Sequence, residues 1–448
     1  MKHVSYISRK KLDQFSQHDL DFIFHQEKLE EFIGLPFSLE NFNAQIRLKD
    51  KNYKIEKREA LSHVLSENYN NLSNNGISLN QIKKLENTST YTITTGHQLC
   101  LLGGPMYFFL KIIHVIKLSE VLNKQFPDKH FIPIFWMASE DHDSDEIDHI
   151  NLFNKTFRWE HQQSGPVGRF QNKNIKLIFE ELLGLFKDNN TQEIREVFDT
   201  FTGQTYGQSF LNWLHHLFGE KGLIIVDGDQ KKLKELFKPI IKAELSQNFS
   251  NNRIQITNKR LKELNRKIQV HSREINLFYL EGNNRTRIIK DENKFKIGQK
   301  AYDLDDLLKN LSDAPEQFSP NAVLRPLYQE CILPNLCYVG GMAEMNYWAQ
   351  LKGVFEEAQI TYPLLQLRSN LLWIDGGISK KMKTSGLFLD DLFKSTAEIK
   401  NQLLTQNDSQ PIDENEIKQG LEAIEHAFKA SITNKQGLNQ WLGSELNT

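Results

Sequence analysis

Cysteine is scarce in this sequence, which has only three, Cys100, Cys331 and Cys337, among 448 residues. They form neither a CxxC pair nor an even-numbered framework of the kind that staples small secreted proteins. No second cluster of His and Cys has zinc-finger spacing, so a structural zinc ion is not expected. Each cysteine has apolar neighbours, and we therefore expect reduced, buried thiols without a catalytic role.

Long apolar runs and an excess of charge of either sign are also missing. No stretch approaches ~18 uninterrupted apolar residues, and no apolar segment follows the basic N-terminus as it would in a signal peptide. Lys and Arg number 55 against 57 Asp and Glu, a formal charge of −2, so no global field attracts nucleic acid or an anionic membrane. These absences predict a cytoplasmic protein that binds neither nucleic acid nor membrane.

The residues that are present suffice for a large apolar core, since 39% are hydrophobic and 10% aromatic. A β-branched run at 91–95 is followed by a glycine-rich turn, a long amphipathic helix beginning near Pro105, and a second apolar strand at 133–139. Such a βαβ unit has parallel strands, and 222–227 has the composition of a further buried parallel strand. The pattern predicts an α/β fold with a Rossmann-like parallel-sheet core.

The remaining segments are expected to divide around that core. We predict a helical lead-in packed on the core at 1–90, the first half of the core at 91–153, a helical connecting insertion at 154–220, a core strand at 221–230, a helical and hairpin insertion at 231–320, the second half of the core at 321–378, and a C-terminal helical, coiled-coil-like region at 379–448.

The turn after the first strand reads Thr95-Gly96-His97-Gln98 and continues to Gly103-Gly104. Its glycines allow a tight turn and close approach of a ligand, and the following helix offers free N–H groups to an anion. It matches neither GxGxxG nor the Walker pattern, so ligand binding and a purely structural turn both remain open. His97 could hydrogen-bond a phosphate or carry a proton.

An acidic cluster, Glu140-Asp141-His142-Asp143, follows the second strand, and more acids and His149 lie just downstream. The carboxyl end of a parallel strand is where open α/β sheets bind ligands. Three interpretations compete: a Mg²⁺, Mn²⁺ or Zn²⁺ site, a metal-free site that orients an amine or hydroxyl and moves its proton, and acids that cap a helix. His142 and Glu146 would share a helix face if a helix begins there.

A third group of candidate residues lies in the second half of the core. Arg325 can fork onto a carboxylate or phosphate, and Gly340-Gly341 before a helix repeats the arrangement of the first turn. Glu344 is either a site residue or a first-turn acid that favours the helix dipole. Arg368, at the end of an apolar run, is either an ion-pair partner or a substrate contact.

Taken together, four blocks of this sequence resemble the cysteine-adding enzymes of bacillithiol biosynthesis in their order and spacing: TTGHQLCLLGGPMYFFLKIIHVIKLSE, PIFWMASEDHDSDEIDHI, VLRPLYQECILPNLCYVGGMAEMNYWAQLK and PLLQLRSNLLWID. The resemblance implies a Rossmann-type core similar to that of class I aminoacyl-tRNA synthetases. It also implies a ligase that joins cysteine to the amine of glucosaminyl-malate in the last step of bacillithiol synthesis. ATP or another nucleotide is the expected activator of the carboxyl group.

The resemblance further implies a homodimer formed through the C-terminal helical region. The sequence departs from the family in two places. His97 stands where many relatives have Gln, and the C-terminal region is shorter, because it ends at Thr448 without a second long helix and without heptads in its last residues.

The leading hypothesis is a ligase site in one crevice that holds cysteine and glucosaminyl-malate without a metal ion. Its catalytic candidates are His97, Glu140, Asp141 and His142. Its substrate-binding candidates are Gly96, Gln98, Gly103, Gly104, Asp143, Arg325, Gln329, Gly340, Gly341, Glu344, Arg368 and Ser369. The alternatives are a metal-dependent hydrolase of a small amide or phosphoester, which would use the cluster from Glu140 to His149, and a non-catalytic scaffold that binds a nucleotide or thiol.

Overall fold

The computed structural model describes residues 4–12, 14–153, 155–186, 190–406, 415 and 417–424. The chain forms two compact units, one of His25–Asn370 and one that combines Met1–Phe24 with Leu371–Thr448. The boundary of the core therefore falls at Asn370 rather than at 378. The first residues belong with the C-terminal part instead of with the expected lead-in at 1–90.

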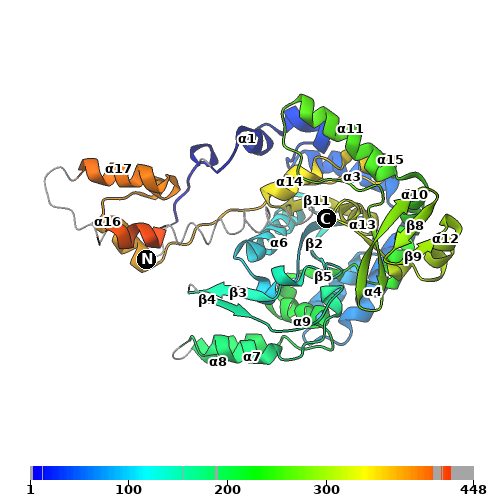
Figure 1. Ribbon diagram of the computed structural model, residues 1–448, viewed down its shortest axis with the longest axis horizontal. Coiled ribbons are helices and arrows are strands. Elements are labelled where there is room, and N and C mark those ends of the chain that lie inside the picture. The colour runs from blue at the N-terminus through cyan, green and yellow to red at the C-terminus, as the bar shows by residue number, and fades with distance from the viewer. Residues whose placement is uncertain are drawn as a thin grey trace. The chain divides into compact units, whose positions relative to one another are not determined.

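A five-stranded parallel sheet forms the centre of the larger unit, in the order β12-β11-β1-β2-β5 (Figure 1). Its strands are β1 (Thr90–His97), β2 (His130–Met137), β5 (Ile224–Asp227), β11 (Asn335–Gly340) and β12 (Leu364–Leu367). From β1 the chain adds strands first on one side and later on the other, so the order reverses between β1 and β11. The Rossmann-like fold is confirmed, and the reversal marks the usual ligand position of such sheets.

Helices cover both faces of this sheet because its strands alternate their side chains. On one face, Phe135 of β2 packs against Phe108 of α6 (Tyr107–Gln125), with ring centroids 5.3 Å apart, and against Phe210 of α9 (Tyr206–Phe218). On the other face, the adjacent Trp136 meets Tyr328 of α13 (Leu324–Ile332) at 5.4 Å. A strand buried on both faces explains the continuous apolar run that predicted it.

The other α-helices of the larger unit are α2 (Glu30–Ile33), α3 (Asn41–Asn52), α4 (Ile55–Tyr69), α5 (Gly76–Lys84), α7 (Ile175–Leu183), α8 (Asn190–Asp199), α10 (Lys231–Gln247), α11 (Phe249–Glu263), α12 (Leu304–Asp313), α14 (Met342–Trp348) and α15 (Lys352–Glu357). The last two follow Gly340-Gly341, where the sequence predicted a helix. Gln350 lies in the break between them, fully buried, and its amide bonds both the N–H and the carbonyl of Val270, at 2.8 and 2.9 Å.

Two antiparallel sheets accompany the parallel one. The first, of order β10-β6-β7-β8-β9, contains β6 (Leu277–Glu281), β7 (Asn284–Asp291), β8 (Lys294–Ile297), β9 (Lys300–Tyr302) and β10 (Phe318–Pro320). The second is a hairpin of β3 (His149–Leu152) and β4 (Lys155–Arg158), which the sequence analysis did not predict. Its first strand begins at His149, the last residue of the cluster from Glu140 to His149 that the hydrolase alternative would use.

The smaller unit contains α1 (Gln17–Phe24), α16 (Gly376–Thr384) and α17 (Thr396–Gln406). Its small apolar core is made by Met382, Leu387, Leu392, Ile399 and Leu403. Much of the expected coiled-coil-like region at 379–448 lies outside the described residues. Within the described part of the chain, no helix combines the length and the apolar character needed to cross a membrane.

Candidate active site

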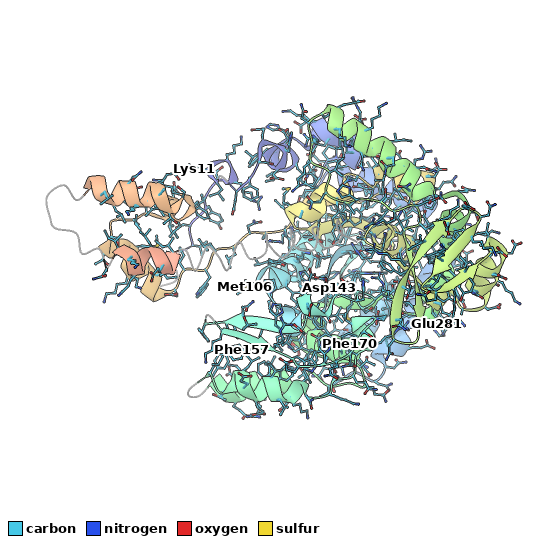
Figure 2. All side chains as sticks on the ribbon, in the orientation of Figure 1. Lys11, Met106, Asp143, Phe157, Phe170 and Glu281 are labelled. Atoms are coloured by element: carbon cyan, nitrogen blue, oxygen red, sulfur yellow. The ribbon has the colours of Figure 1, made fainter. Side chains whose placement is uncertain are left out.

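The first two predicted motifs meet at the carboxyl edge of the parallel sheet. β1 and β2 are neighbours, with His97 opposite Met137, so the turns that follow them lie side by side. The side-chain amide of Gln98 donates to Asp141 Oδ2 at 2.9 Å and to Glu146 Oε2 at 2.6 Å. The labelled Asp143 marks the place of the acidic cluster in Figure 2. The structure therefore brings together the glycine-rich turn and the acidic cluster.

Four carboxylates form what we call the acidic group: Glu140, Asp141, Glu146 and Asp227. Glu140 pairs with Lys234 of α10, whose fully buried ammonium also donates to the carbonyl of Phe318 at 2.7 Å. Burial raises the pKa of Glu140, and the charge of Lys234 opposes that rise. Asp227 ends β5 and accepts from the hydroxyl of Ser139, and burial with the nearby Asp229 raises its pKa to about 6.

Asp141 and His142 lie at the exposed side of this group. Burial would raise the pKa of Asp141, but hydrogen bonds from His142 and Gln98 and the charge of Arg285 hold it well below its usual range. Asp141 is therefore ionised at neutral pH. Its neighbour His142 has Nδ1 3.0 Å from Arg285 Nη1, and this arginine comes from β7 of the second insertion.

On the β11 side of the reversal, three cations form what we call the cationic group: Lys111, Arg325 and Arg368. Lys111 of α6 has its ammonium 2.5 Å from Glu344 Oε2 and 2.9 Å from the carbonyl of Gly96, and its side chain is 3% exposed. Glu344 also accepts from the Tyr338 hydroxyl at 2.6 Å. Burial alone would raise the pKa of Glu344, but Lys111 and these hydrogen bonds hold it below its usual value.

The two arginines lie against the predicted glycines. Arg325 bonds Gln329 Oε1 and the Tyr347 hydroxyl at 3.2 and 3.0 Å, and its Nη1 lies 3.7 Å from the place where a Cβ on Gly96 would stand. Arg368 Nε lies 3.6 Å from the corresponding place at Gly341. A Cβ at either glycine would therefore stand in van der Waals contact with a guanidinium group.

Arg368 and Ser369 are held in place by contacts with β11 and α6. The Arg368 N–H donates to the carbonyl of Gly340 at 2.8 Å, and its guanidinium lies over the ring of Tyr107 at 4.8 Å. The backbone N–H of Ser369 donates to His114 Nδ1 at 3.1 Å. Arg368 thus stands beside the start of α6 and the end of β11, and Ser369 stands beside His114 further along α6.

His97 lies between the acidic and cationic groups. Its ring packs against Tyr107 and Phe108, and burial together with the charge of Lys111 lowers its pKa to about 4. Its Nδ1 is 3.0 Å from the carbonyl of Gln98, which can only accept, so the proton of the neutral ring resides on Nδ1. Nε2 then remains as a hydrogen-bond acceptor, and the ring carries no positive charge near pH 7.

Three predicted binding residues instead serve the packing of the chain. Gly103 and Gly104 have φ of +82° and +63°, and a Cβ at these positions would come within 2.7 Å of Phe108 and 2.8 Å of Cys100. Gln329 is fully buried, and its amide donates to Glu330 at 2.9 Å. The space next to these three residues is filled by the protein itself.

The metal interpretation of the acidic cluster finds no support in this geometry. Residues Ser144–Glu146 form a single 3₁₀ turn, so His142 and Glu146 do not share the face of an α-helix. Their partners are Arg285 and Gln98. Across the described ranges, no three His, Cys, Asp or Glu side chains are grouped so that they could hold a metal ion.

Lys111, Lys234 and Arg285 are site residues that the sequence analysis missed. Lys111 had a signal, because it shares the helical spacing of the buried Phe108, Ile112 and Val115 and so occupies a core position of α6. Lys234 had the same signal, because it shares the helical spacing of the buried Phe237 and Ile241 in α10. Arg285 lies in a charged segment, where nothing in the pattern separates it from solvated neighbours.

Comparison with known proteins identifies the family. Residues 3–369 match the family model described as "Bacillithiol biosynthesis BshC, N-terminal Rossmann-like domain". The chain is 37% identical to "Putative cysteine ligase BshC" of Flavobacterium johnsoniae, over 91% of this chain and 78% of the relative. Relatives with the same description from Flavobacterium psychrophilum and Christiangramia forsetii are 39% and 34% identical, over 86% and 94% of this chain and 74% and 80% of theirs. The resemblance of the four blocks is confirmed, and the chain belongs to the BshC family of bacillithiol biosynthesis.

Proposed function

We propose that this protein is a cysteine ligase that joins the carboxyl group of cysteine to the amine of glucosaminyl-malate, the last step of bacillithiol synthesis. Family membership supports the reaction class. The observation that carries the assignment is the placement of a cationic and an acidic group on either side of His97, at one edge of one sheet. A ligase for an amine and a carboxylate must hold both kinds of charge at once.

The cationic group suits the anionic parts of the reactants. Lys111, Arg325 and Arg368 outnumber their single carboxylate, Glu344, so the region keeps an excess of positive charge. This donor set fits phosphate oxygens or the carboxylates of malate, because guanidinium and ammonium groups bind both. ATP or another nucleotide, when bound, supplies the activation that a cysteine carboxylate needs before it forms an amide.

The acidic group suits the amines. An ammonium nitrogen must lose a proton before it attacks an activated carbonyl carbon, and that proton needs an acceptor. Asp141 is ionised and can hold an ammonium group. Glu146, whose pKa burial raises to about 7, can take a proton near neutral pH, and Gln98 fixes the two carboxylates relative to each other. The neutral Nε2 of His97 offers a further acceptor.

Two parts of the proposal rest on the family resemblance. One is a homodimer formed through the C-terminal helical region, and the other is action in the cytoplasm on small molecules. Sedimentation of the full chain would test the first part. A single species at the mass of one chain, over the concentrations used for activity, would contradict it.

The decisive experiment is a reconstitution with purified full-length protein, cysteine, glucosaminyl-malate and ATP, read by mass spectrometry. We expect bacillithiol to form, and Asp141→Asn to form much less. Cells that lack the protein should lose bacillithiol and accumulate glucosaminyl-malate. Chelator-sensitive hydrolysis of a small amide or phosphoester, without ligation, would instead favour the metal-dependent hydrolase.

A further inference from the structure

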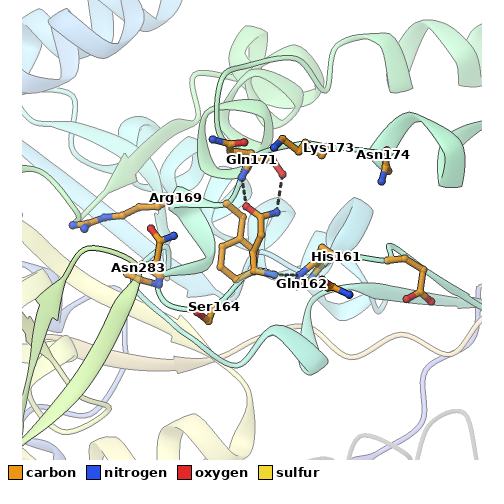
Figure 3. A pocket seen from close by; sticks show the side chains of 12 residues that line it. His161, Gln162, Ser164, Arg169, Gln171, Lys173, Asn174 and Asn283 are labelled. Carbon is orange, nitrogen blue, oxygen red and sulfur yellow. Dashed lines mark hydrogen bonds between the residues drawn. The ribbon is translucent and has the colours of Figure 1, made fainter. Parts of the chain in front are cut away.

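A cavity of about 690 Å³ lies beside the acidic group, between the loop at 160–174 and the hairpin turn at Asn283 (Figure 3). Its volume is within the range of about 300–1,000 Å³ that is typical of small-molecule sites. None of the residues proposed above for the ligase site lines it. The cavity has two walls that are far apart in sequence, since the loop joins β4 to α7 and the turn joins β6 to β7.

The loop wall is held in shape by hydrogen bonds. Gln163 and Gln171 bond reciprocally across the loop, side-chain amide to carbonyl at 2.9 Å and backbone N–H to side-chain oxygen at 2.7 Å, as the dashed lines of Figure 3 mark. The indole N–H of Trp159 donates to the carbonyl of Lys173 at 2.8 Å. A cavity that is braced without a ligand requires little ordering when a ligand binds.

The two walls touch backbone to backbone at Gly165. This residue has a φ of +90°, and a Cβ there would stand 2.0 Å from the carbonyl oxygen of Asn283. Only glycine permits this contact, which joins the loop to the hairpin of the second insertion.

Three of the free polar groups of the cavity are amides. The side chains of Gln162, Asn174 and Asn283 have no hydrogen-bond partner in the part of the chain that the structure describes, and all three line the space. An amide carries donors and acceptors together, as does a pair of neighbouring hydroxyl groups, so such a lining matches a polyhydroxylated ligand.

The charges and apolar groups of the lining also favour an uncharged, polar ligand. Arg169 is engaged by Asp229 through two hydrogen bonds of 2.6 and 2.7 Å, which leaves Lys173 and Glu160 as opposite charges. Pro166 and Phe170 are the apolar residues of the lining. With little net charge and mostly polar residues in its lining, the cavity suits neither a polyanion nor a purely hydrophobic ligand.

The loop that lines the cavity is hydrogen-bonded to the segment that carries the acidic group. The N–H of Val167 donates to the carbonyl of Asp141 at 2.7 Å, and the N–H of Gly168 donates to that of Ser139 at 2.8 Å. The backbone next to Pro166 and Arg169 is therefore bonded to the end of β2. A ring held in the cavity would present a substituent toward the carboxylates that suit an ammonium group.

We infer that this cavity binds a polyhydroxylated ring of hexose size, the sugar of the amine substrate. The inference rests on the proposed function and extends it, because it assigns the sugar to a place distinct from the cationic group. The acidic group would then receive the amine that the sugar carries.

Two variants test the inference in the full-length protein. The double variant Gln162→Leu/Asn174→Gly removes two amides and keeps the left-handed backbone at 174, where φ is +64°, and Ser164→Trp fills the space; all three positions are exposed or at the rim. We expect the KM for glucosaminyl-malate to rise at least about tenfold with the KM for cysteine unchanged. Gln192→Leu on α8, which removes an exposed amide elsewhere, is the matched control and should change neither.

Binding of methyl glucosaminide, malate and AMP, each followed alone by ligand-observed NMR, separates this inference from the proposed function. Methyl glucosaminide should bind the unaltered protein and lose binding in both variants. If ligation fails while this pattern holds, the cavity assignment stands and the ligase assignment falls. If ligation proceeds with an unchanged KM for glucosaminyl-malate in both variants, or if the variants lose AMP binding instead, the cavity assignment is overturned.

Discussion

Two buried lysines stand on either side of the strand reversal, and each pairs with a glutamate just beyond the end of a strand. Lys111 of α6 meets Glu344 after β11, and Lys234 of α10 meets Glu140 after β2. Around the first pair the chain adds two arginines, whereas around the second it adds three carboxylates. Each ion pair has a net charge near zero. The net charge of each region is therefore determined by the residues around its pair.

The two buried lysines position the site, whereas the residues around them are the candidates for binding and chemistry. A buried ion pair is weak evidence for stability, because desolvation opposes the attraction between the charges. Its value here is positional: Lys111 also bonds the carbonyl of Gly96, and Lys234 that of Phe318, so each lysine joins a helix, a strand end and a second segment.

Removal of either lysine is expected to give the largest effect on stability. Lys234→Met should lower the free energy of unfolding by about 3–5 kcal/mol, because Glu140 would keep a buried charge without a partner. Lys111→Met should cost less, since the side chain of Glu344 is 22% exposed against 12% for Glu140 and retains its bond from Tyr338. Urea unfolding of both variants measures the difference.

Double variants provide the control for this ordering. Lys234→Met/Glu140→Gln and Lys111→Met/Glu344→Gln remove both charges and should each recover part of the loss. Equal costs for the two single variants, or no recovery in the double variants, would contradict the idea that the two pairs differ through the burial of their glutamates.

Substitution of Asp141 or His142 is expected to affect activity instead. Asp141→Asn and His142→Ala should lower the ligation rate by about 10²-fold or more, as expected for groups that orient or carry protons. The thermal midpoint should move by only a few degrees for His142→Ala, whose side chain is exposed, and further for Asp141→Asn, because the hydrogen bonds that hold down the pKa of Asp141 also stabilise the folded state. A large loss of stability with full activity per folded molecule would identify the cluster as a structural cap.

The sequence predicted the fold well where the signals are local. The β-branched run before Gly96, the turn and the amphipathic helix after Pro105 each follow from neighbouring residues, and parallel pairing then brings the ends of β1 and β2 together. The same logic predicted that the segments of Gln98 and Asp141 would meet. It failed for the β3–β4 hairpin, whose strands of four residues are too short for a clear alternation.

The part of the site that the sequence did not predict depends on contacts between residues that are far apart in the chain. Lys234 shares the helical spacing of the buried Phe237 and Ile241 in α10, but the sequence does not reveal that its partner is Glu140, 94 residues away. Arg285 reaches His142 from 143 residues further along the chain. Conversely, Gly103 and Gly104 looked like ligand-binding glycines, because the sequence does not reveal that Phe108 and Cys100 fill the space beside them.

The pH dependence of stability tests the acidic side of the comparison. Burial raises the pKa of Glu146 from 4.5 to about 7, so the folded state binds its proton more tightly than the unfolded state does. This contribution is complete below about pH 4, decreases as the pH rises, and is lost above about pH 7. Glu146→Gln removes it, so we expect the variant to gain about 1–2 kcal/mol relative to the unaltered protein between pH 5 and pH 8, after allowance for partial exposure.

Urea unfolding at the two pH values provides the measurement, with Glu120→Gln on the exposed side of α6 as the control. The control should show no such gain, because its side chain is 46% exposed and pairs with Lys117 at the surface. A difference between Glu146→Gln and the unaltered protein that stays constant with pH would show that Glu146 is ionised throughout this range.

The smallest effect is expected at the thiol nearest to the site, even though covalent use of a thiol would suit a cysteine-adding enzyme. Cys100 Sγ lies 3.9 Å from His97 Nδ1 and 3.8 Å from the carbonyl of Glu146. Burial, reinforced by Glu146 and Asp141, raises the pKa of this thiol to about 12, so the nucleophilic thiolate is almost absent at neutral pH. Cys100→Ala should therefore cost about 1–2 kcal/mol of stability from the lost packing and leave the rate per folded molecule unchanged. Cys337→Ala, which removes a fully buried thiol within β11, is the matched control and should behave in the same way. Loss of ligation in folded Cys100→Ala but not in Cys337→Ala, or a covalent adduct on Cys100 detected by mass spectrometry during turnover, would make Cys100 a nucleophile and overturn the metal-free, non-covalent arrangement proposed for the crevice.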